Sequence, residues 1–547
     1  MEPNICEQDR HMDYETLYKE FTWDIPKYYN FGFEVVDRWA EDRTKLALVS
    51  IHSDGEKASY HTFYDLKRLS DRFANAMLDL GVKKGDRVLV MLESIPQWYV
   101  VLIGMFKIGV IPMPGTVLLT SKDIKYRINR AEANVVITDV AHVGRVERVA
   151  SECPTLQHKI VVDGPVLEWL HYEDLMRKAD DEIDRGGIEK TRSDDPMLLY
   201  FTSGTTGQPK MVLHTHSYPI GHEVTARFAQ ALNSCDLHWA ISETGWAKAA
   251  WGKLFGQMIV GAAIIQWETP GRFDPDGLLK AMARHGVTTF CAPPTVYRML
   301  IQQDLKKYNL KLRHSMSAGE PLNPEVIKVW KDTFGLDIYD FYGQTETVCV
   351  LSNYPFMPIK YGSVGKPTPG HDVRIVDDEG NELPPNEEGN IALYLGDHRP
   401  PGLMKEYWKD EEEMGKAFHH GYYYTGDRAF RDEDGYFWFV GRDDDVIKSS
   451  GYRIGPFEVE SALMEHPAVA ECAVVGAPDP KGVRGILVKA FIVLARGYSP
   501  SEDLTVDIQN YVKETTAPYK YPRIIEYSKE LPKTISGKIL RRELRKK

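Results

Sequence analysis

The residues best suited to chemistry lie in one short polar loop, Thr-Ser-Gly-Thr-Thr-Gly-Gln-Pro-Lys, at positions 202–210. Glycine lets the backbone approach a ligand closely, hydroxyl and backbone N–H groups donate to phosphate oxygens, and a lysine offsets their negative charge. This composition predicts a phosphate-binding loop. The spacing differs from a Walker A loop, because only two residues separate Gly204 from Gly207 and Pro209 precedes Lys210. A polar hairpin turn without a ligand is the alternative interpretation.

The other residue types that often do chemistry are scattered. His214, His216 and His238 lack the spacing of metal ligands, so we interpret them as structural or at most as pocket-lining residues. The six cysteines form no C-x-x-C pair, which argues against a zinc knuckle or a disulfide framework and favours a reducing compartment. They are Cys6, Cys153, Cys235, Cys291, Cys349 and Cys472.

The elements that must position the loop alternate between helices and apolar strands. Strand patterns cover residues 87–92, 134–138, 196–201, 287–291 and 336–342, and helical patterns cover residues 64–80, 97–109, 278–285 and 295–304. This alternation predicts an α/β fold with a largely parallel sheet. After about residue 370 short β segments replace it, and the charged turn 441–445 marks the predicted boundary of a small C-terminal α/β unit.

Size and charge limit the classes of protein that this chain can represent. Its 547 residues exceed what one hydrophobic core supports, so we expect two or more domains. The net charge of −12 argues against a general nucleic-acid binder. The apolar stretches 99–115 and 254–267 are broken by Lys107 and by Gly256, Gln257 and Gly261, so neither predicts a membrane span. The polar, acidic N-terminus is unlike a signal or transit peptide, and we expect a cytoplasmic protein.

Six motifs, in this order, resemble those of the adenylate-forming superfamily of acyl-CoA synthetases, adenylation domains and luciferases. They are the loop 202–210, Tyr-Gly-Gln-Thr-Glu at 342–346, Tyr-Thr-Gly-Asp at 424–427, Gly-Arg-Asp-Asp at 441–444, Ser-Gly-Tyr-Arg at 450–453 and Pro-Lys-Thr-Ile-Ser-Gly-Lys at 532–538. The stretches 236–239, 243–246, 452–458 and 516–523 are most similar to medium-chain acyl-CoA synthetases.

The resemblance implies a fold and a reaction. The fold is a large N-terminal domain, residues 1–443, made of two α/β subdomains and a β-barrel-like subdomain, followed by a small mobile α/β domain, residues 444–547. In the reaction, a carboxylate attacks the α-phosphate of MgATP to give acyl-AMP and pyrophosphate, and coenzyme A then displaces AMP to give a thioester. The substrates are thus ATP, coenzyme A and a small carboxylic acid. A homodimer is one assembly compatible with this fold.

The resemblance also assigns the nucleotide site. The phosphates are held by the loop residues Thr202, Ser203, Gly204, Thr205, Thr206, Gly207, Gln208, Pro209 and Lys210. Adenine and the α-phosphate are held by Gly319, Glu320, Pro321, Asp340, Phe341, Tyr342, Gly343, Gln344 and Thr345. Thr345 also touches the acyl carboxylate, and Glu346 binds Mg²⁺ as a hard oxygen donor. Asp427 bonds the ribose hydroxyls, with Arg442 and Arg453 completing the ATP site.

The small domain carries the mobile parts implied by the resemblance. Taken alone, Lys538 would be a solvated tail lysine, but its motif implies a catalytic cation that balances charge during adenylation. Asp444 is the hinge about which the domain rotates between the two half-reactions. Coenzyme A then meets Ser450, Gly451 and Tyr452 and the basic residues Arg484, Lys513 and Arg523.

The acyl pocket is the least determined part. Trp246 and Gly343 are expected to line it, with a core tryptophan as the alternative for Trp246. Lys248 places a cation in an apolar segment, so it either points to solvent or a partner, or narrows the pocket. The acid is therefore a medium-chain, branched short-chain or aryl acid. The rival functions are an adenylating enzyme that does not use coenzyme A, a luciferase-like oxygenase, and a non-catalytic nucleotide-binding homologue.

Overall fold

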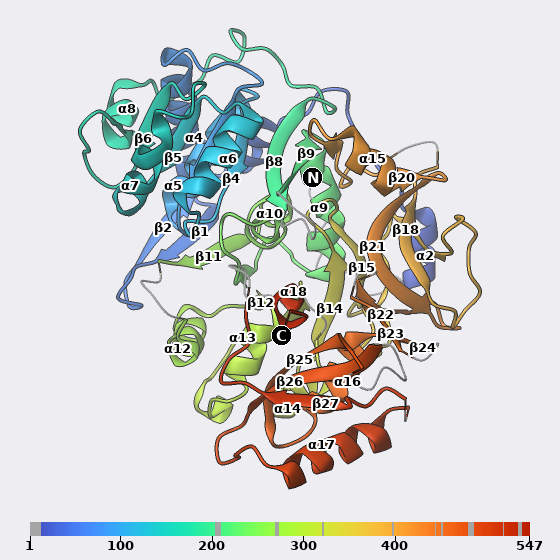
Figure 1. Cartoon of the computed structure of the whole chain (residues 1–547). Helices are drawn as coiled ribbons and strands as arrows, with labels where there is room; N and C mark the ends of the chain where they lie inside the picture. Colours follow the sequence, from blue (N-terminus) through green and yellow to red (C-terminus); the bar gives the residue numbers. More distant parts are fainter. Residues whose placement is uncertain are drawn as a thin grey trace.

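Two largely parallel sheets form the body of the molecule, and a small α/β unit follows them in the chain (Figure 1). The computed structural model describes residues 13–202, 209–268, 273–319, 322–396, 399–442, 445–449, 452–479, 486–517, 519–533 and 539–546. For Lys448, Tyr452 and Arg453 it describes the backbone alone.

The first sheet is entirely parallel and has the order β4-β3-β5-β6-β7. Its strands are β3 (Arg87–Met91), β4 (Ile111–Pro114), β5 (Val135–Thr138), β6 (His158–Val161) and β7 (Leu170–His171). The helices of this subdomain are α4 (Phe63–Asp79), α5 (Pro96–Lys107), α6 (Ser121–Ala131), α7 (Val140–Ala150) and α8 (Tyr172–Lys178). Thr62 and Asp65 form a capping box that starts α4, and Thr120 and Asp123 form another at α6.

The second sheet has the order β16-β15-β14-β13-β12-β10-β11-β1-β2, with a parallel centre from β14 to β1. Its strands are β1 (Leu46–Ile51), β2 (Ala58–Thr62), β10 (Leu237–Ala240), β11 (Ala263–Trp267), β12 (Thr289–Ala292), β13 (His314–Ala318), β14 (Ile338–Gly343), β15 (Cys349–Ser352) and β16 (Lys366–Pro367). Its helices are α9 (Tyr218–Val224), the π-helix η3 (Thr225–Ala229), α10 (Ala247–Lys253), α11 (Phe255–Ile259), α12 (Pro275–His285), α13 (Pro294–Leu300) and α14 (Pro324–Phe334), with the 3₁₀ turn η4 (Leu305–Lys307).

The loop 202–210 joins two antiparallel strands, β8 (Pro196–Thr202) and β9 (Lys210–Thr215), which pair Thr202 with Lys210. The short strand β19 (Glu406–Tyr407) extends this hairpin into a three-stranded sheet. A further antiparallel sheet, with helix α15 (Glu411–Ala417) beside it, makes up the β-rich part of the large unit. Its strands are β17 (Asp372–Val376), β18 (Gly389–Tyr394), β20 (Phe418–His419), β21 (Tyr422–Arg431) and β22 (Phe437–Arg442).

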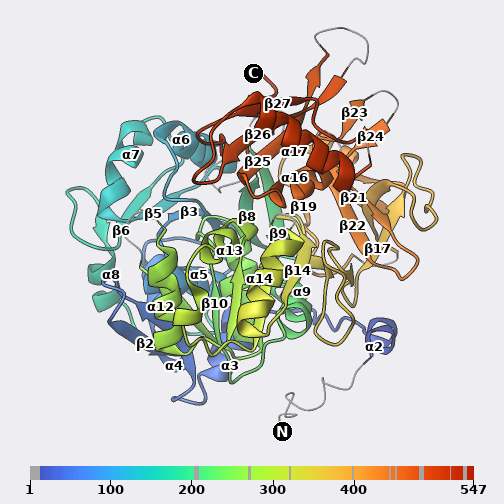
Figure 2. The same cartoon turned by 90° about the horizontal axis from the view of Figure 1, so that it is seen from below.

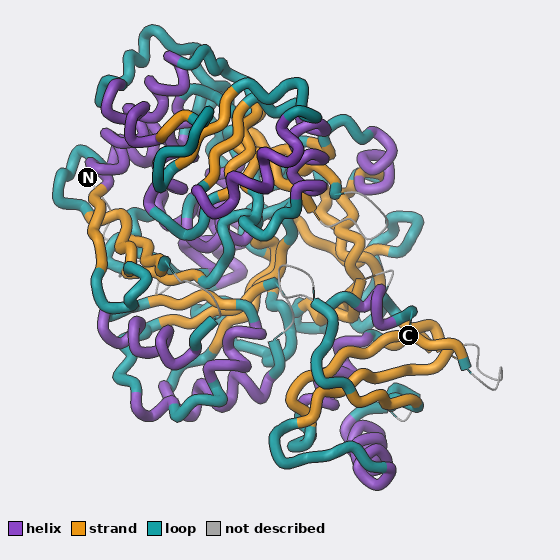
Figure 3. The backbone as a smooth tube through the Cα atoms, turned by 60° about the vertical axis from the view of Figure 1, so that its left-hand side comes forward, coloured by secondary structure: helices purple, strands orange, loops and turns teal. Residues whose placement is uncertain are grey.

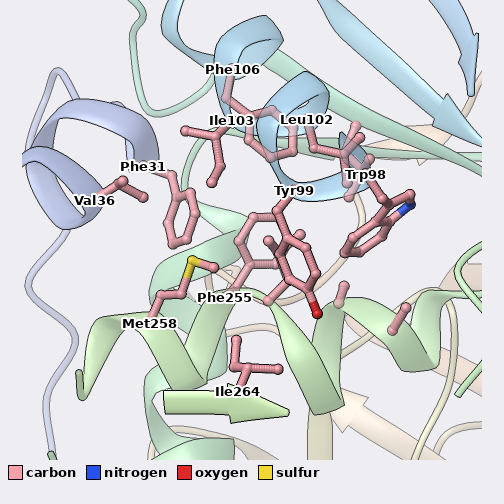
Figure 4. Close-up of a cluster of buried hydrophobic side chains, with 14 of the residues drawn as sticks. Phe31, Val36, Trp98, Tyr99, Leu102, Ile103, Phe106, Phe255, Met258 and Ile264 are labelled. Atoms are coloured by element: carbon pink, nitrogen blue, oxygen red, sulfur yellow. The ribbon is translucent and has the colours of Figure 1, made fainter. Parts of the chain in front are cut away.

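One aromatic cluster joins the two α/β subdomains (Figure 4). Phe106 on α5 and Phe31 in the N-terminal segment both pack against Phe255 on α11, with the Phe31 and Phe255 ring centroids 4.9 Å apart and the rings nearly perpendicular. The N-terminal segment that supplies Phe31 contains α2 (Tyr14–Glu20), the π-helix η2 (Gly32–Val36) and α3 (Asp37–Trp39). The relative position of the two sheets is therefore fixed by apolar packing.

The small unit forms a separate lobe, which carries the C label at the lower right of Figure 3. It contains the hairpin β23 (Ile447–Ser449) and β24 (Tyr452–Ile454), the sheet β25 (Val469–Pro478), β26 (Ile486–Leu494) and β27 (Ile524–Tyr527), and the helices α16 (Pro456–Met464), α17 (Glu502–Thr515) and α18 (Arg541–Leu544). Helix α16 packs against β25, against α17 and against β22 of the large unit (Figure 2). This helix thus joins the two units.

The predicted α/β fold class is confirmed, with some elements shifted at their ends. Helix α12 ends at Gly286, which adopts the left-handed conformation that glycine tolerates best, as the sequence predicts. The helix predicted over 295–304 is too long: α13 ends at Leu300, and the chain turns before a separate 3₁₀ turn buries Leu305. None of the helices in the described ranges is long and apolar enough to cross a bilayer.

Candidate active site

The predicted catalytic turn 342–346 stands at the carboxyl end of β14, next to the carboxyl end of β13. In open α/β sheets this edge is where ligands bind. A local hydrogen bond stabilises the turn, because the backbone N–H of Gln344 donates to Oγ1 of Thr347, the residue after the turn, at 2.9 Å. The residues predicted for the nucleotide and for the acyl carboxylate therefore share one rigid corner of the second sheet.

A hydrogen-bond network links this turn to Asp427 on β21. The Tyr342 hydroxyl donates to Asp427 Oδ2 at 2.6 Å, and Gln344 Nε2 donates to the same oxygen at 2.7 Å. Tyr423 holds Gln344 in place by donating to its Oε1 at 2.9 Å. Arg442 pairs in register with Asp427 across β21 and β22. The structure thus brings together five residues from two segments, 342–344 and 423–442, that are far apart in the sequence.

Glu346 and Lys210 meet at Tyr407 on β19. The Tyr407 hydroxyl donates to Glu346 Oε1 at 2.9 Å. Lys210 lies over the Tyr407 ring, 4.9 Å from its centroid, and forms an ion pair with Glu413 on α15. Sequence reasoning missed Tyr407 and Glu413, because neither lies in a recognisable motif.

Strand β9 explains how the loop and the turn are held together. Side chains alternate along a strand. Met211 and Leu213 therefore pack into the hydrophobic cluster that includes residues of β3 and β4, while Lys210 and His214 lie on the opposite face of β9. The ring Nε2 of His214 lies 2.8 Å from the carbonyl oxygen of Thr345. One strand therefore carries Lys210 of the predicted phosphate loop and a direct contact to the predicted catalytic turn.

Burial changes the acidity of two carboxyl groups at this corner. It raises the pKa of Glu346, and the hydrogen bond from Tyr407 acts in the opposite direction. Burial also raises the pKa of Asp340 to about 8, against the opposing effect of the Leu322 N–H, which donates to Asp340 Oδ2 at 3.2 Å. Asp340 Oδ1 is buried and has no hydrogen-bond partner among the described residues.

Lys248, the cation in an apolar segment, is half-buried on α10. Its Nζ donates to the carbonyl oxygen of Ala318 at 2.6 Å, at the end of β13. A Cβ on Gly319 would lie 3.8 Å from this nitrogen. The ammonium is therefore directed at the strand end that leads into the predicted adenine-binding segment.

A second tryptophan on the same helix contacts the predicted acyl pocket. Trp246 is half-buried and precedes the first residue of α10. Trp251, further along α10, is the tryptophan beside Gly343: a Cβ on Gly343 would meet its ring carbon Cη2 at 2.7 Å. Only the repeated tryptophan in Trp-Ala-Lys-Ala-Ala-Trp could have drawn attention to it.

Two of the basic residues predicted to bind coenzyme A converge on one aromatic ring. Lys513 on α17 lies 4.3 Å from the centroid of the Tyr521 ring, and the Arg523 guanidinium lies 4.6 Å from it. The spacing of ten residues hides this pairing in the sequence, because β27 and α17 come together only in the folded unit.

Several predicted residues lie outside the described part of the chain. They are Ser203, Gly204, Thr205, Thr206, Gly207 and Gln208 of the loop, Glu320 and Pro321, the hinge Asp444, Ser450, Gly451, Arg484 and Lys538, together with the side chains of Tyr452 and Arg453. Among the described residues, no group of three or more His, Cys, Asp or Glu side chains is arranged to hold a metal ion.

His238, interpreted from the sequence as structural or at most pocket-lining, bonds between two strands of the second sheet. His238 Nδ1 lies 2.8 Å from Thr289 Oγ1, between neighbouring strands β10 and β12.

Comparison with known proteins gives the family. The model of the AMP-binding enzyme family matches residues 35–408, and that of the AMP-binding enzyme C-terminal domain matches residues 458–538. The chain belongs to the AMP-binding enzyme family. The suspected resemblance to adenylate-forming enzymes is thereby confirmed.

Relatives of the family match along nearly the whole chain. The human mitochondrial acyl-coenzyme A synthetase ACSM3 is 45% identical over 547 residues, covering 98% of this chain and 92% of that protein. The rat mitochondrial acyl-coenzyme A synthetase ACSM4 is 45% identical, with 95% and 91% covered. Among solved structures, the anthranilate CoA ligase AuaEII in complex with anthranoyl-AMP has a TM-score of 0.87 at 32% identity, covering 96% of this chain and 98% of that one. A Burkholderia xenovorans benzoate CoA ligase has a TM-score of 0.83 at 29% identity, with 94% and 100% covered.

Proposed function

We propose that this chain is an AMP-forming acyl-CoA synthetase. The observation that carries the proposal is the convergence of Lys210, Glu346 and Asp427 on one corner of the second sheet. Similarity to acyl-CoA synthetases over nearly the full chain supports the same activity.

In the first half-reaction, a carboxylate oxygen of the acid bonds to the α-phosphorus of ATP, and the bond from that phosphorus to the departing pyrophosphate breaks. Negative charge builds up on the phosphoryl oxygens, so fixed cations and N–H donors lower the barrier. Lys210 is held over the Tyr407 ring and supplies one such cation. Asp427 receives the ribose hydroxyls, and Thr345 meets the acid carboxylate.

Magnesium fits the chemistry of the site. Mg²⁺ is usually bound through one or two carboxylates plus substrate phosphates, and Glu346 offers one carboxylate whose Oε1 is already oriented by Tyr407. Bound there, Mg²⁺ would neutralise phosphate charge.

In the second half-reaction, the coenzyme A sulfur bonds to the acyl carbon, the bond from that carbon to the AMP oxygen breaks, and the thiol proton passes to solvent. Lys513 and Arg523 offer two cations around Tyr521 for the nucleotide end of coenzyme A. Rotation about Asp444 exchanges Lys538 for the 450–453 segment between the two steps.

The acid is compact. The Trp251 ring packs closely against Gly343, which is predicted to line the acyl pocket, and this favours a medium-chain, branched short-chain or aryl acid over a long straight chain. The cytoplasmic location expected from the sequence stays a prediction, whereas the ACSM3 and ACSM4 relatives are mitochondrial proteins.

The test is a panel of straight, branched and aromatic acids assayed for AMP formation with and without coenzyme A. We expect turnover of compact acids that requires coenzyme A. Pyrophosphate release without any need for coenzyme A would indicate an adenylating enzyme instead, and no carboxylate-dependent release would indicate a non-catalytic homologue.

The matched variants are Lys538→Ala and Lys546→Ala. Lys546, a tail lysine, forms an ion pair with Glu543 at 2.7 Å, so its loss should leave turnover unchanged. Lys538→Ala should lose adenylation yet still convert supplied acyl-AMP to acyl-CoA. Equal behaviour of the two variants would remove Lys538 from the mechanism.

A further inference from the structure

Lys210 and Glu413 form an ion pair that the proposed mechanism does not use. Lys210 is the first residue of β9, and its ammonium meets the carboxylate of Glu413 on α15. The same ammonium lies 4.9 Å from the centroid of the Tyr407 ring. The Lys210 and Glu413 side chains are only 26% and 20% exposed. A carboxylate and an aromatic face thus fix the position of one flexible side chain.

The backbone around Glu413 is held in place, so its carboxylate is a fixed partner. Strand β19, which contains Tyr407, pairs with β9, and α15 follows β19 in the chain. The backbone N–H of Glu413 donates to Oδ1 of Asp410, the N-cap residue of α15, at 3.2 Å. The backbone N–H of Tyr407 lies 3.1 Å from Met414 Sδ, which ties β19 to the same helix. The start of α15 therefore stands at a set position beside Lys210.

The charge of Glu413 is shared between two lysines. Lys416 Nζ lies 2.8 Å from Glu413 Oε1, on the same helix. The hydrogen bond from Lys210 holds the pKa of Glu413 below its usual range, and Lys416 acts in the same direction, so the carboxylate is ionised at neutral pH. Glu412, which also pairs with Lys416, is 80% exposed and is screened by solvent. An isolated carboxylate would repel a triphosphate, whereas two lysines sharing one carboxylate attract it.

A lysine that is held in advance binds a phosphate at a lower entropic cost. A free lysine side chain has many rotamers, and a ligand that fixes it loses part of its affinity to that ordering. Lys210 is the last residue of the predicted phosphate loop, and its ammonium is a cation that the loop offers to a triphosphate. Contacts that hold this ammonium before ATP arrives therefore raise the affinity for ATP.

We propose that Glu413 is a positioning residue, which holds the Lys210 ammonium ready for the β- and γ-phosphates of ATP. It acts through Lys210 and does not itself contact the nucleotide. The inference rests on the proposed synthetase function and adds to it a residue that lies in none of the six motifs.

The test measures equilibrium binding of MgATP and of AMP to the full chain by titration calorimetry, without acid or coenzyme A. AMP lacks the β- and γ-phosphates, so its Kd is the internal reference. Glu413→Gln keeps the size of the side chain and removes the charge that holds the ammonium. We expect the Kd for MgATP to rise about two- to tenfold, the cost of ordering one long side chain, and the Kd for AMP to stay the same.

The matched control is Glu412→Gln, which removes the neighbouring carboxylate that pairs with Lys416 at 2.7 Å. Both of its Kd values should match those of the wild type. A second series adds Glu413→Gln to Lys210→Met. Because Glu413 acts through Lys210, the added substitution should change the Kd for MgATP by less than about twofold in this background.

An unchanged or lower Kd for MgATP in Glu413→Gln would overturn the inference and leave the synthetase function standing. An equal rise for MgATP and AMP would show a general effect on the fold and would also overturn it. Additive effects of Glu413→Gln and Lys210→Met would exclude an action through the lysine. A wild type that binds neither nucleotide would overturn the proposed function and the inference together.

Discussion

The hydrogen bond from Tyr407 to Glu346 gives a sharp test of the proposed metal-binding carboxylate. Tyr407→Phe removes the hydroxyl that donates to Glu346 Oε1 at 2.9 Å and keeps the ring beneath Lys210. A hydrogen bond to the ionised form lowers the pKa of a carboxyl group. Its loss must therefore raise the pKa of Glu346, so the carboxylate form is lost at a higher pH than in the wild type.

The size of the shift follows from the strength of the bond. A hydrogen bond to a charged group contributes about 1.5–3 kcal/mol, and one pKa unit corresponds to about 1.4 kcal/mol. Tyr407→Phe should therefore move the acid limb of the pH profile upward by about 1–2 pH units. At a pH on the wild-type acid limb, this shift is about a ten- to hundredfold loss of the ionised carboxylate.

The assay is pyrophosphate release as a function of pH and Mg²⁺, giving kcat/KM for MgATP. The control is Tyr18→Phe, which removes a hydroxyl that donates to the His371 carbonyl oxygen at 3.0 Å, remote from the turn. An acid limb that stays in place, or one that moves equally in both variants, would refute the role given to Tyr407.

Two further perturbations test the fold around the site. Lys107→Met should destabilise the protein by about 1.5–3 kcal/mol, seen as a lower urea midpoint, because it removes the buried ammonium that bonds Asp37 and Asp71 at 2.7 and 2.6 Å, while Arg185 and Lys67 still pair with these carboxylates; adding Asp71→Asn should recover part of the loss, and an unchanged midpoint would contradict this account. Gly343→Ala should raise the KM for the acid at least about tenfold, because its Cβ would lie 2.2 Å from the carbonyl oxygen of Val348 and the turn must shift; an unchanged KM would show that the turn tolerates the shift.

The sequence predicts local structure well where one pattern decides it. Helix α12 ends at Gly286, directly after the predicted helical pattern 278–285, since apolar spacing and a glycine cap act within a few turns of the chain. The parallel sheets follow from the alternation of such segments. The end of α13 is missed because burial of Leu305, a tertiary effect, replaces the helix by a separate turn.

The site is predictable only as far as its motifs reach. Tyr407 approaches Glu346 across 61 residues of sequence, and Lys107 meets Asp37 across 70. Nothing in the neighbouring residues of either partner signals the other. Lys107 even lies in an apolar stretch, where its charge looks like an interruption and is in fact neutralised by a buried pair of carboxylates.

The small sheet of β8, β9 and β19 explains why the two halves of the site can act together. Lys210 is the first residue of β9, and His214 lies on the same face of that strand. Tyr407 on β19 pairs with Val212 on β9. Through these side chains the strands contact Glu346 and the Thr345 carbonyl oxygen at 2.9 and 2.8 Å. We therefore predict that a displacement of this hairpin shifts the 342–346 turn through these two hydrogen bonds, so that ATP bound at the predicted phosphate loop would alter the position of the predicted acid-binding turn.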